Sequence, residues 1–311
     1  MFGWIPFSVG DLMYAVAGLW LIYQVLKFVR EIKRKKADRK YLLNTLAGTL
    51  KVGLYVYVVF NLLWGLNYNR YGIDYQMNIE SIDYNDEDLV KLTQELATQM
   101  NALQPASVEP RQQLYRKRNL FNGAVQSYKT LRQTYPLFSY NHPSIKPSIY
   151  SYLGNYLGFT GYYNPFTGEA QVNTTVPVFI RPFTTCHEIG HQLGYAKESE
   201  ANFAAYLSGA VSNDPAFLYS IYFEMYAYAA RYLYYSDSVA LKGINAQLSP
   251  AVKGDIRTLR AFFNRYDNPF ETAIDKLYSQ YLKANEQPAG KMSYNEVIGM
   301  LIAYYRKNGR I

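Results

Sequence analysis

Two histidines four residues apart, with a glutamate directly after the first, are the residues of this chain best suited to chemistry. They are His187, Glu188 and His191, in the segment His-Glu-Ile-Gly-His. On a helix, positions i and i+4 share a face, so both imidazoles can bind one metal ion while Glu188 acts on a water molecule at that metal. This H-E-x-x-H pattern predicts Zn²⁺-assisted hydrolysis, most often of peptide bonds, with Glu188 as the general base.

The motif stands well above chance for this composition. The chain has 3 histidines among 311 residues, and two of them lie in the motif. Shuffling such a composition would produce H-E-x-x-H in on the order of one chain in a thousand. The competing interpretation is a helix with two ordinary surface histidines, which metal analysis would distinguish from a zinc site.

A catalytic zinc ion generally takes three protein ligands and keeps one position for water. The remaining histidine, His142, lies in an Asn-His-Pro segment, so we expect a carboxylate as the third ligand. Gly194 can end the motif helix in the left-handed conformation, and Glu198 and Glu200 then open the next helix. We favour Glu198, because Asn202 would share its helical face and could hydrogen-bond a ligand there. Glu200 remains the alternative.

Composition and charge limit the classes of function. With 49% hydrophobic and 17% aromatic residues, the chain has ample material for a core, which excludes a disordered protein. The net charge of +8 is concentrated in residues 27–40, which carry eight basic and two acidic residues, so we expect no nucleic-acid partner. The single cysteine, Cys186, excludes intramolecular disulfides, and we expect it to pack as a small residue rather than to bind metal.

Two apolar stretches flank the basic segment, at about residues 12–29 and 46–66. Each is about long enough to span a bilayer, and a pair of buried amphipathic helices is the alternative. A cleaved signal peptide fits poorly, because no positive n-region precedes the first stretch and no small-residue cleavage site follows it. All tryptophans of the chain lie in or near these stretches, as expected for an aromatic belt: Trp4, Trp20 and Trp64.

We therefore interpret residues 1–68 as a membrane anchor of two transmembrane helices with a basic cytoplasmic loop. By the positive-inside rule, residues 69–311 then lie on the opposite side of the bilayer. This predicts a multi-pass protein of the cell (inner) membrane that contacts the lipid bilayer through its N-terminal helices. The domain with the motif is expected to be extracytoplasmic, which in a cell with two membranes means periplasmic.

The remainder of the chain predicts a mainly α fold of the α+β class with a small β element. Helices are expected at residues 86–103, 111–134, 198–212, 215–235, 250–266, 269–285 and 294–307. Pro105 and Pro110 predict a break between the first two of these helices. The best strand candidate, residues 169–173, precedes the motif helix in the order in which many H-E-x-x-H peptidases place a substrate-aligning edge strand. An ordinary core or hairpin strand is the alternative.

The segment 187–203 resembles the zincin metallopeptidases of the gluzincin type, in which a glutamate helix of the form E-x-x-A-[N/D] follows the H-E-x-x-H helix. It reads His-Glu-Ile-Gly-His-Gln-Leu-Gly-Tyr-Ala-Lys-Glu-Ser-Glu-Ala-Asn-Phe. Nearly the whole chain is similar to an uncharacterised bacterial family of domain-of-unknown-function proteins, which have two N-terminal membrane helices and a C-terminal H-E-x-x-H domain.

The resemblance implies that His187 and His191 are Zn²⁺ ligands, that Glu188 is the general base and that Glu198 is the third ligand. It also implies a zincin-like domain fold. The interval from His191 to Glu198 is shorter than in gluzincins and closer to the metzincin spacing, so the choice between Glu198 and Glu200 stays open.

These observations predict a membrane-anchored, zinc-dependent metallopeptidase that acts on a peptide or protein substrate. The alternative from another class is a non-catalytic zinc-binding scaffold protein of the cell envelope. An intramembrane protease is disfavoured, because the motif lies about 120 residues past the last apolar stretch and is not embedded in one.

Overall fold

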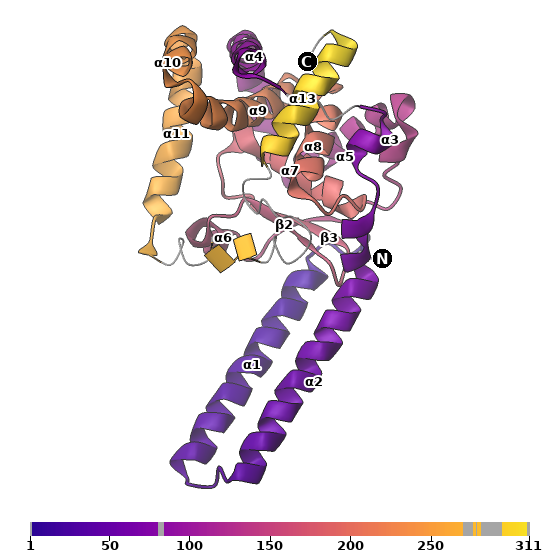
Figure 1. The fold of residues 1–311 in the computed structure, drawn as a ribbon, viewed down its shortest axis with the longest axis vertical. Helices are drawn as coiled ribbons and strands as arrows, with labels where there is room; N and C mark the ends of the chain where they lie inside the picture. Colours follow the sequence, from indigo (N-terminus) through magenta and orange to yellow (C-terminus); the bar gives the residue numbers. More distant parts are fainter. Residues whose placement is uncertain (1, 80–83, 270–275, 278, 281–293, 310–311) are drawn as a thin grey trace.

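The computed structural model describes residues 2–79, 84–269, 276–277, 279–280 and 294–309. This part of the chain is mainly α-helical and contains one small three-stranded sheet (Figure 1). The predicted fold class, mainly α with a small β element and two apolar N-terminal helices, is confirmed. The helix predicted at residues 269–285 lies largely outside the described residues.

Two long helices come first, α1 (Val9–Lys33) and α2 (Arg39–Leu63). Ser8 and Asp38 cap them, because each side chain accepts a hydrogen bond from the backbone N–H three residues later. The helices extend from the domain as a hairpin with its connecting turn at the far end (Figure 1). Both are long and apolar enough to cross a membrane, and no residue in the most apolar stretch of either is buried. The alternative of two buried amphipathic helices is therefore wrong.

The other described helices form the domain. They are η1 (Gly65–Asn69), α3 (Ile73–Gln76), α4 (Asp86–Gln113), α5 (Lys117–Thr134), η2 (Pro136–Phe138), α6 (Ser151–Leu157), η3 (Val178–Ile180), α7 (Arg181–Gln192), α8 (Glu198–Ala210), α9 (Pro215–Ser236), α10 (Ser238–Gln247), α11 (Pro250–Tyr266) and α13 (Tyr294–Asn308). One continuous apolar core joins α4, α5, α7, α8 and α9. Cys186 is fully buried in this core, as predicted.

The break predicted at the two prolines is wrong. Helix α4 continues through Pro105 and Pro110 and ends only at Gln113. Tertiary contacts outweigh the lost backbone hydrogen bonds here, because α4 packs along α9 and the buried Arg111 holds the final turns in place. The Arg111 guanidinium donates hydrogen bonds to the hydroxyl of Ser107 (2.6 Å) and to the carboxylate of Asp255 on α11.

The sheet has the order β1-β3-β2, with β1 (Ile145–Pro147) parallel and β2 (Gly161–Asn164) antiparallel to β3 (Glu169–Val172). The predicted strand at residues 169–173 is confirmed as β3. Because β3 is the central strand, its backbone is paired on both sides, and the interpretation of it as an edge strand is wrong. The edge strand that contacts α7 is β2.

The sheet also holds the first turn of α1. The Glu169 carboxylate accepts hydrogen bonds from the backbone N–H groups of Val9 (3.2 Å) and Gly10 (2.6 Å), which are among the unsatisfied donors of a helix N-terminus. In return, Asp11 of α1 accepts a hydrogen bond from the backbone N–H of Ile149 (2.7 Å). The domain is therefore docked onto the start of α1 through buried polar contacts.

Candidate metal centre

Helix α7 carries the motif and ends in a left-handed turn. Gly194 has a φ of +90°, and its N–H donates a hydrogen bond to the carbonyl oxygen of His191 (2.8 Å). The N–H of Tyr195 donates to the carbonyl oxygen of Gly190 (3.2 Å). The prediction that Gly194 ends the helix is confirmed. The turn reverses the chain, so that α8 begins at Glu198 and returns along α7.

A glycine inside the motif lets α8 approach α7 closely. A Cβ atom at Gly190 would lie 3.2 Å from both the Cα and the carbonyl oxygen of Ala201, and 3.4 Å from the Cβ of Ala204. A larger residue at position 190 would therefore push the helices apart, because packed cores have little free space. The close approach carries the first residue of α8, Glu198, to the histidines.

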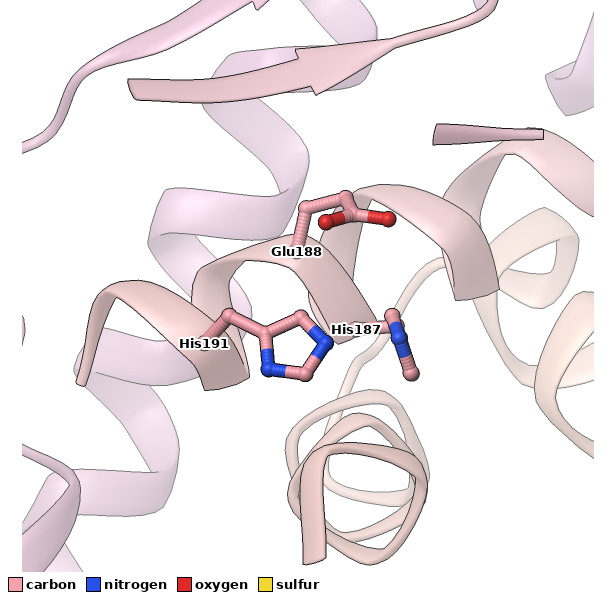
Figure 2. Close-up of side chains that lie close together, drawn as sticks. All are labelled: His187, Glu188 and His191. Carbon is pink, nitrogen blue, oxygen red and sulfur yellow. The ribbon is translucent and has the colours of Figure 1, made fainter. Parts of the chain in front are cut away.

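The predicted residues of the motif meet on α7, where the rings of His187 and His191 lie next to each other (Figure 2). The Nε2 atom of His187 is 3.3 Å from Oε2 of Glu198, and the Nε2 atom of His191 is 3.7 Å from Oε1 of the same carboxylate. Potential ligand atoms of His187, Glu188 and His191 all lie within 4.8 Å of one another. The structure thus brings together all four predicted site residues.

The second ring nitrogen of each histidine has its own hydrogen-bond partner. Nδ1 of His191 is 2.7 Å from the carbonyl oxygen of Tyr195, which can only accept, so Nδ1 carries a proton. Nδ1 of His187 is 2.7 Å from Oδ1 of Asn202. Donation from both Nδ1 atoms leaves the two Nε2 atoms for a metal ion, and such outer partners are typical of zinc-binding histidines.

Burial and the Glu198 carboxylate shift the two histidine pKa values in opposite directions. Burial alone would lower the pKa of His187, but the hydrogen bond and negative charge of Glu198 outweigh it and raise this pKa to about 9. Burial lowers the pKa of His191 to about 4, more than the charge of Glu198 raises it. The Glu198 carboxylate therefore favours a positive charge at the two histidines, and a bound cation would supply that charge.

Glu188 lies on the side of α7 that faces the sheet, with its Oε1 atom close to Gly161 of β2. Its Oε2 atom is buried and has no hydrogen-bond partner among the described residues. Burial raises the pKa of Glu188 to about 8. A buried acceptor without a partner costs free energy, and a water molecule at the metal would relieve that cost.

These residues fit Zn²⁺. Two imidazoles and one carboxylate are the His₂Glu donor set of catalytic zinc sites, and the remaining carboxylate, Glu188, is placed beside that set. The outer hydrogen bonds of the histidines have the arrangement that such sites need.

Glu200, the alternative ligand, points to another part of the molecule. Its Oε1 atom accepts a hydrogen bond from the backbone N–H of Ile73 (3.2 Å), at the start of α3. Burial raises the pKa of Glu200 to about 7. Of the two glutamates, the structure places Glu198 and not Glu200 at the histidines. His142 is an exposed loop residue and does not belong to the cluster of potential metal ligands.

A pocket of about 600 Å³ opens over the site. Aromatic side chains from five regions of the chain form much of its wall. They include Trp64 and Tyr68 after α2, Phe159 and Tyr163 around β2, Phe183 of α7, Tyr228 of α9 and Phe263 of α11. Contacts between rings support this wall, since the ring centroids of Trp64 and Tyr163 lie 4.3 Å apart in a tilted arrangement and both rings lie near His191.

One acidic residue of the pocket, Glu224, was not predicted from the sequence. Glu224 of α9 lines the pocket, and burial raises the pKa of this carboxyl to about 7, while the charge of His187 opposes the shift. The sequence contains an indication that Glu224 has a special role, because it is the only acidic residue in the apolar, tyrosine-rich helix at residues 215–235. A carboxyl group in such an apolar helix requires a specific environment.

Fold and site together define a mainly helical protein with two long apolar N-terminal helices and a His–Glu cluster beneath an aromatic pocket. The chain belongs to the family described as "Protein of unknown function (DUF3810)", which matches residues 1–302. Comparisons with the curated proteins and with the solved structures find no match.

Proposed function

We propose that this protein is a membrane-anchored zinc metallopeptidase that hydrolyses peptide bonds on the extracytoplasmic side. The observation that carries the proposal is the position of one carboxylate, Glu198, 3.3 Å and 3.7 Å from the Nε2 atoms of His187 and His191. A second carboxylate, Glu188, lies beside this set with an unpaired buried oxygen. The resemblance of the segment 187–203 to gluzincins supports the same conclusion.

In the proposed mechanism, His187, His191 and Glu198 hold Zn²⁺, which when bound would supply Lewis-acid activation of water and of the peptide carbonyl. Glu188 accepts the proton of the attacking water and delivers it to the leaving amine. Burial raises the pKa of Glu188, which makes its carboxylate a stronger base than a carboxylate in water. Tyr195 and Asn202 keep the imidazoles oriented through their Nδ1 atoms.

The edge of β2 is suited to align a peptide across this site. The N–H of Asn173 donates to the carbonyl oxygen of Thr160 (2.8 Å), so the main-chain groups of Thr160 and Tyr162 point toward β3. By the same alternation, those of Gly161 and Tyr163 point to the outer edge, and both residues line the pocket. A substrate strand that pairs with this edge would lie beside Glu188 and the histidines.

The membrane assignment rests on α1 and α2, whose most apolar stretches contain no residue that the described part of the protein buries. Their connecting turn, at the end far from the domain, belongs to the basic segment, residues 27–40. By the positive-inside rule this end is cytoplasmic, which leaves the domain and its site on the opposite face.

The test uses the full-length protein in detergent or lipid discs. Elemental analysis should find about one zinc per chain, and incubation with a mixed-sequence peptide library should yield cleaved peptides. The variant Glu188→Gln should keep zinc and lose hydrolysis by about 10² to 10⁴-fold, the usual contribution of a general base. Glu200→Gln is the matched control, because it changes a buried glutamate of the neighbouring helix that does not face the metal.

Each outcome decides between the candidates. Protein without zinc would contradict the metal centre. Zinc with no hydrolysis of any peptide would favour the second candidate, a non-catalytic zinc-binding scaffold of the cell envelope. Equal hydrolysis by the wild type and Glu188→Gln would exclude Glu188 as the base. In cells, comparing cleaved envelope peptides between the wild type and Glu188→Gln would identify the substrates.

A further inference from the structure

The exposed face of helix α6 is apolar. The small or polar residues of this helix face the protein, whereas its large side chains point outward, with Tyr152 70% and Leu153 52% exposed. We call this surface the α6 face; it consists of Ile149, Tyr152, Leu153 and Tyr156. The segment from residue 147 to residue 168 contains no charged side chain. A helix that meets water normally shows the opposite pattern, so the α6 face indicates an apolar or interfacial environment.

The α6 face lies level with the start of α1. The Asp11 carboxylate accepts the backbone N–H of Ile149 (2.7 Å), and the Asp11 carbonyl oxygen accepts the hydroxyl of Tyr150 (2.9 Å). These bonds tie the beginning of α6 to the first turns of a helix whose residues 16–23 are all exposed. Figure 1 shows α6 on the side of the domain from which α1 and α2 extend.

The N-terminal segment adds a tryptophan at the same level. The Nζ atom of Lys146 donates to the carbonyl oxygens of Gly3 (3.2 Å) and Ile5, which fixes this segment against β1. Trp4 between them is 82% exposed. Tryptophan is enriched where a protein crosses from hydrocarbon to water, because its ring is apolar and its N–H needs a polar partner.

The pocket opens beside this surface. Leu157, the last residue of α6, and Phe159 just after it line the pocket. Another part of the wall includes Trp64 and Tyr68, which directly follow α2. Two walls of the site are thus continuous with elements that lie where α1 and α2 meet the domain.

We propose that the α6 face rests on the surface of the bilayer that α1 and α2 enter, and that the pocket takes polypeptides held at that surface. The substrate class is a membrane-proximal segment of a membrane-bound or lipid-anchored protein. This inference rests on the proposed peptidase function only in its statement about substrates. The lipid contact rests on the exposed apolar side chains of the α6 face, on the hydrogen bonds that tie this face to Asp11 of α1, and on the apolar helices α1 and α2.

Lipid contact is tested with single introduced cysteines in the full-length protein in lipid discs. Leu153→Cys and, as a second position on the same face, Tyr152→Cys are labelled with an environment-sensitive fluorophore. The native Cys186 does not interfere, because it is fully buried and burial raises its pKa to about 12. Val239→Cys on α10 is the control, exposed on the side of the domain far from α1 and α2 (Figure 1).

Lipids that carry a nitroxide near the headgroup should quench the labels at 152 and 153 several-fold more than the label at 239. Equal quenching at all three positions would overturn the proposal. Weak quenching at 152 and 153 together with their crosslinking between two chains would also overturn it, because the α6 face would then bind a second copy of the protein.

The statement about substrates is tested with one mixed-sequence peptide library in two forms, free in solution or attached to a lipid in the same discs. Wild-type protein should cleave the lipid-attached form at least about 10-fold faster at equal total concentration, since attachment raises the local concentration. The double variant Tyr152→Ser, Leu153→Ser should lose this preference and cleave the free form within two-fold of the wild-type rate. Equal rates for both forms in the wild type would contradict surface delivery. Absence of all cleavage would contradict the peptidase function, while the quenching result would still decide the lipid contact.

Discussion

The amide oxygen of Asn202 on α8 lies 2.7 Å from Nδ1 of His187 on α7. This contact joins the two helices that supply the candidate zinc ligands, and it fixes which nitrogen of the ring faces Glu198. Asn202 is therefore placed to control the orientation of a ligand without touching the metal itself.

We expect Asn202→Ala to weaken zinc binding by about 10 to 100-fold, the usual cost of losing an outer hydrogen bond to a metal-binding histidine. The reason is that His187 would lose the acceptor that selects its tautomer. Asn202→Asp, which retains an acceptor at this position, should restore most of the affinity. Competition with a zinc-binding dye measures both values. An affinity unchanged in Asn202→Ala would show that the bond does not support the ligand.

The choice of third ligand leads to a paired prediction on α8. Glu198→Ala should reduce zinc affinity by more than about 100-fold, because it removes a ligand rather than its support. Glu200→Gln should leave zinc content unchanged, since Glu200 bonds to the backbone of Ile73 instead. Zinc content after dialysis against a weak chelator measures the difference. The reverse pattern, with zinc lost only in Glu200→Gln, would assign the ligand to the other glutamate.

Much of the candidate site was predictable because it is local in sequence. His187, Glu188 and His191 lie within five residues on one helix, and Gly194 and Glu198 follow within the next turn and loop, so periodicity and turn chemistry suffice to relate them. Glu224 comes from α9 and was missed, because no local rule indicates which distant helix covers a site. The contribution of Trp64 to the pocket wall was missed for the same reason. Trp64 packs against Tyr163 only because of how the end of α2 meets the sheet.

The fold follows the same division between local and tertiary information. The two apolar helices and the strand at residues 169–173 have clear patterns and were predicted. The continuation of α4 through Pro105 and Pro110 was not, because the packing along α9 and the Arg111–Asp255 contact outweigh the proline signal. Whether a strand is central or at an edge depends on partners far along the chain, so the position of β3 could not be inferred.

Glu200 should make the stability of the domain depend on pH. Burial raises its pKa to about 7 in the folded protein from an ordinary value of 4.5, so between these pH values the folded state binds more protons than the unfolded state. The free energy of unfolding therefore falls as pH rises from about 4.5 to about 7, by at most about 3 kcal/mol. Melting temperatures at pH 5 and pH 8, with a chelator present to remove metal effects, measure the fall.

Glu200→Gln is the control for that measurement. It keeps an acceptor oxygen for the N–H of Ile73 but cannot titrate, so the part of the pH dependence that Glu200 causes should vanish. The variant should also melt at a higher temperature than the wild type at pH 8. Identical pH dependence in the two proteins would show that Glu200 is not a titrating buried group.

Gly161 of β2 should be essential for the position of the general base. A Cβ atom there would lie 2.7 Å from Oε1 of Glu188, 2.9 Å from Cγ2 of Thr184 and 3.0 Å from the backbone oxygen of Gln171. Because the backbone of the central strand cannot easily move, the Glu188 side chain must give way in Gly161→Ala. We expect hydrolysis to fall by at least about 10-fold while zinc content stays near one per chain, since displacements of about 1 Å in a catalytic group have such effects.

Gly243→Ala on α10 is the matched control, because its added methyl group would meet no atom within 4 Å, and it should leave the hydrolysis rate unchanged. Full activity in Gly161→Ala would mean that Glu188 does not act from the position seen here, whereas loss of zinc together with activity would indicate that the substitution disturbs α7 as a whole.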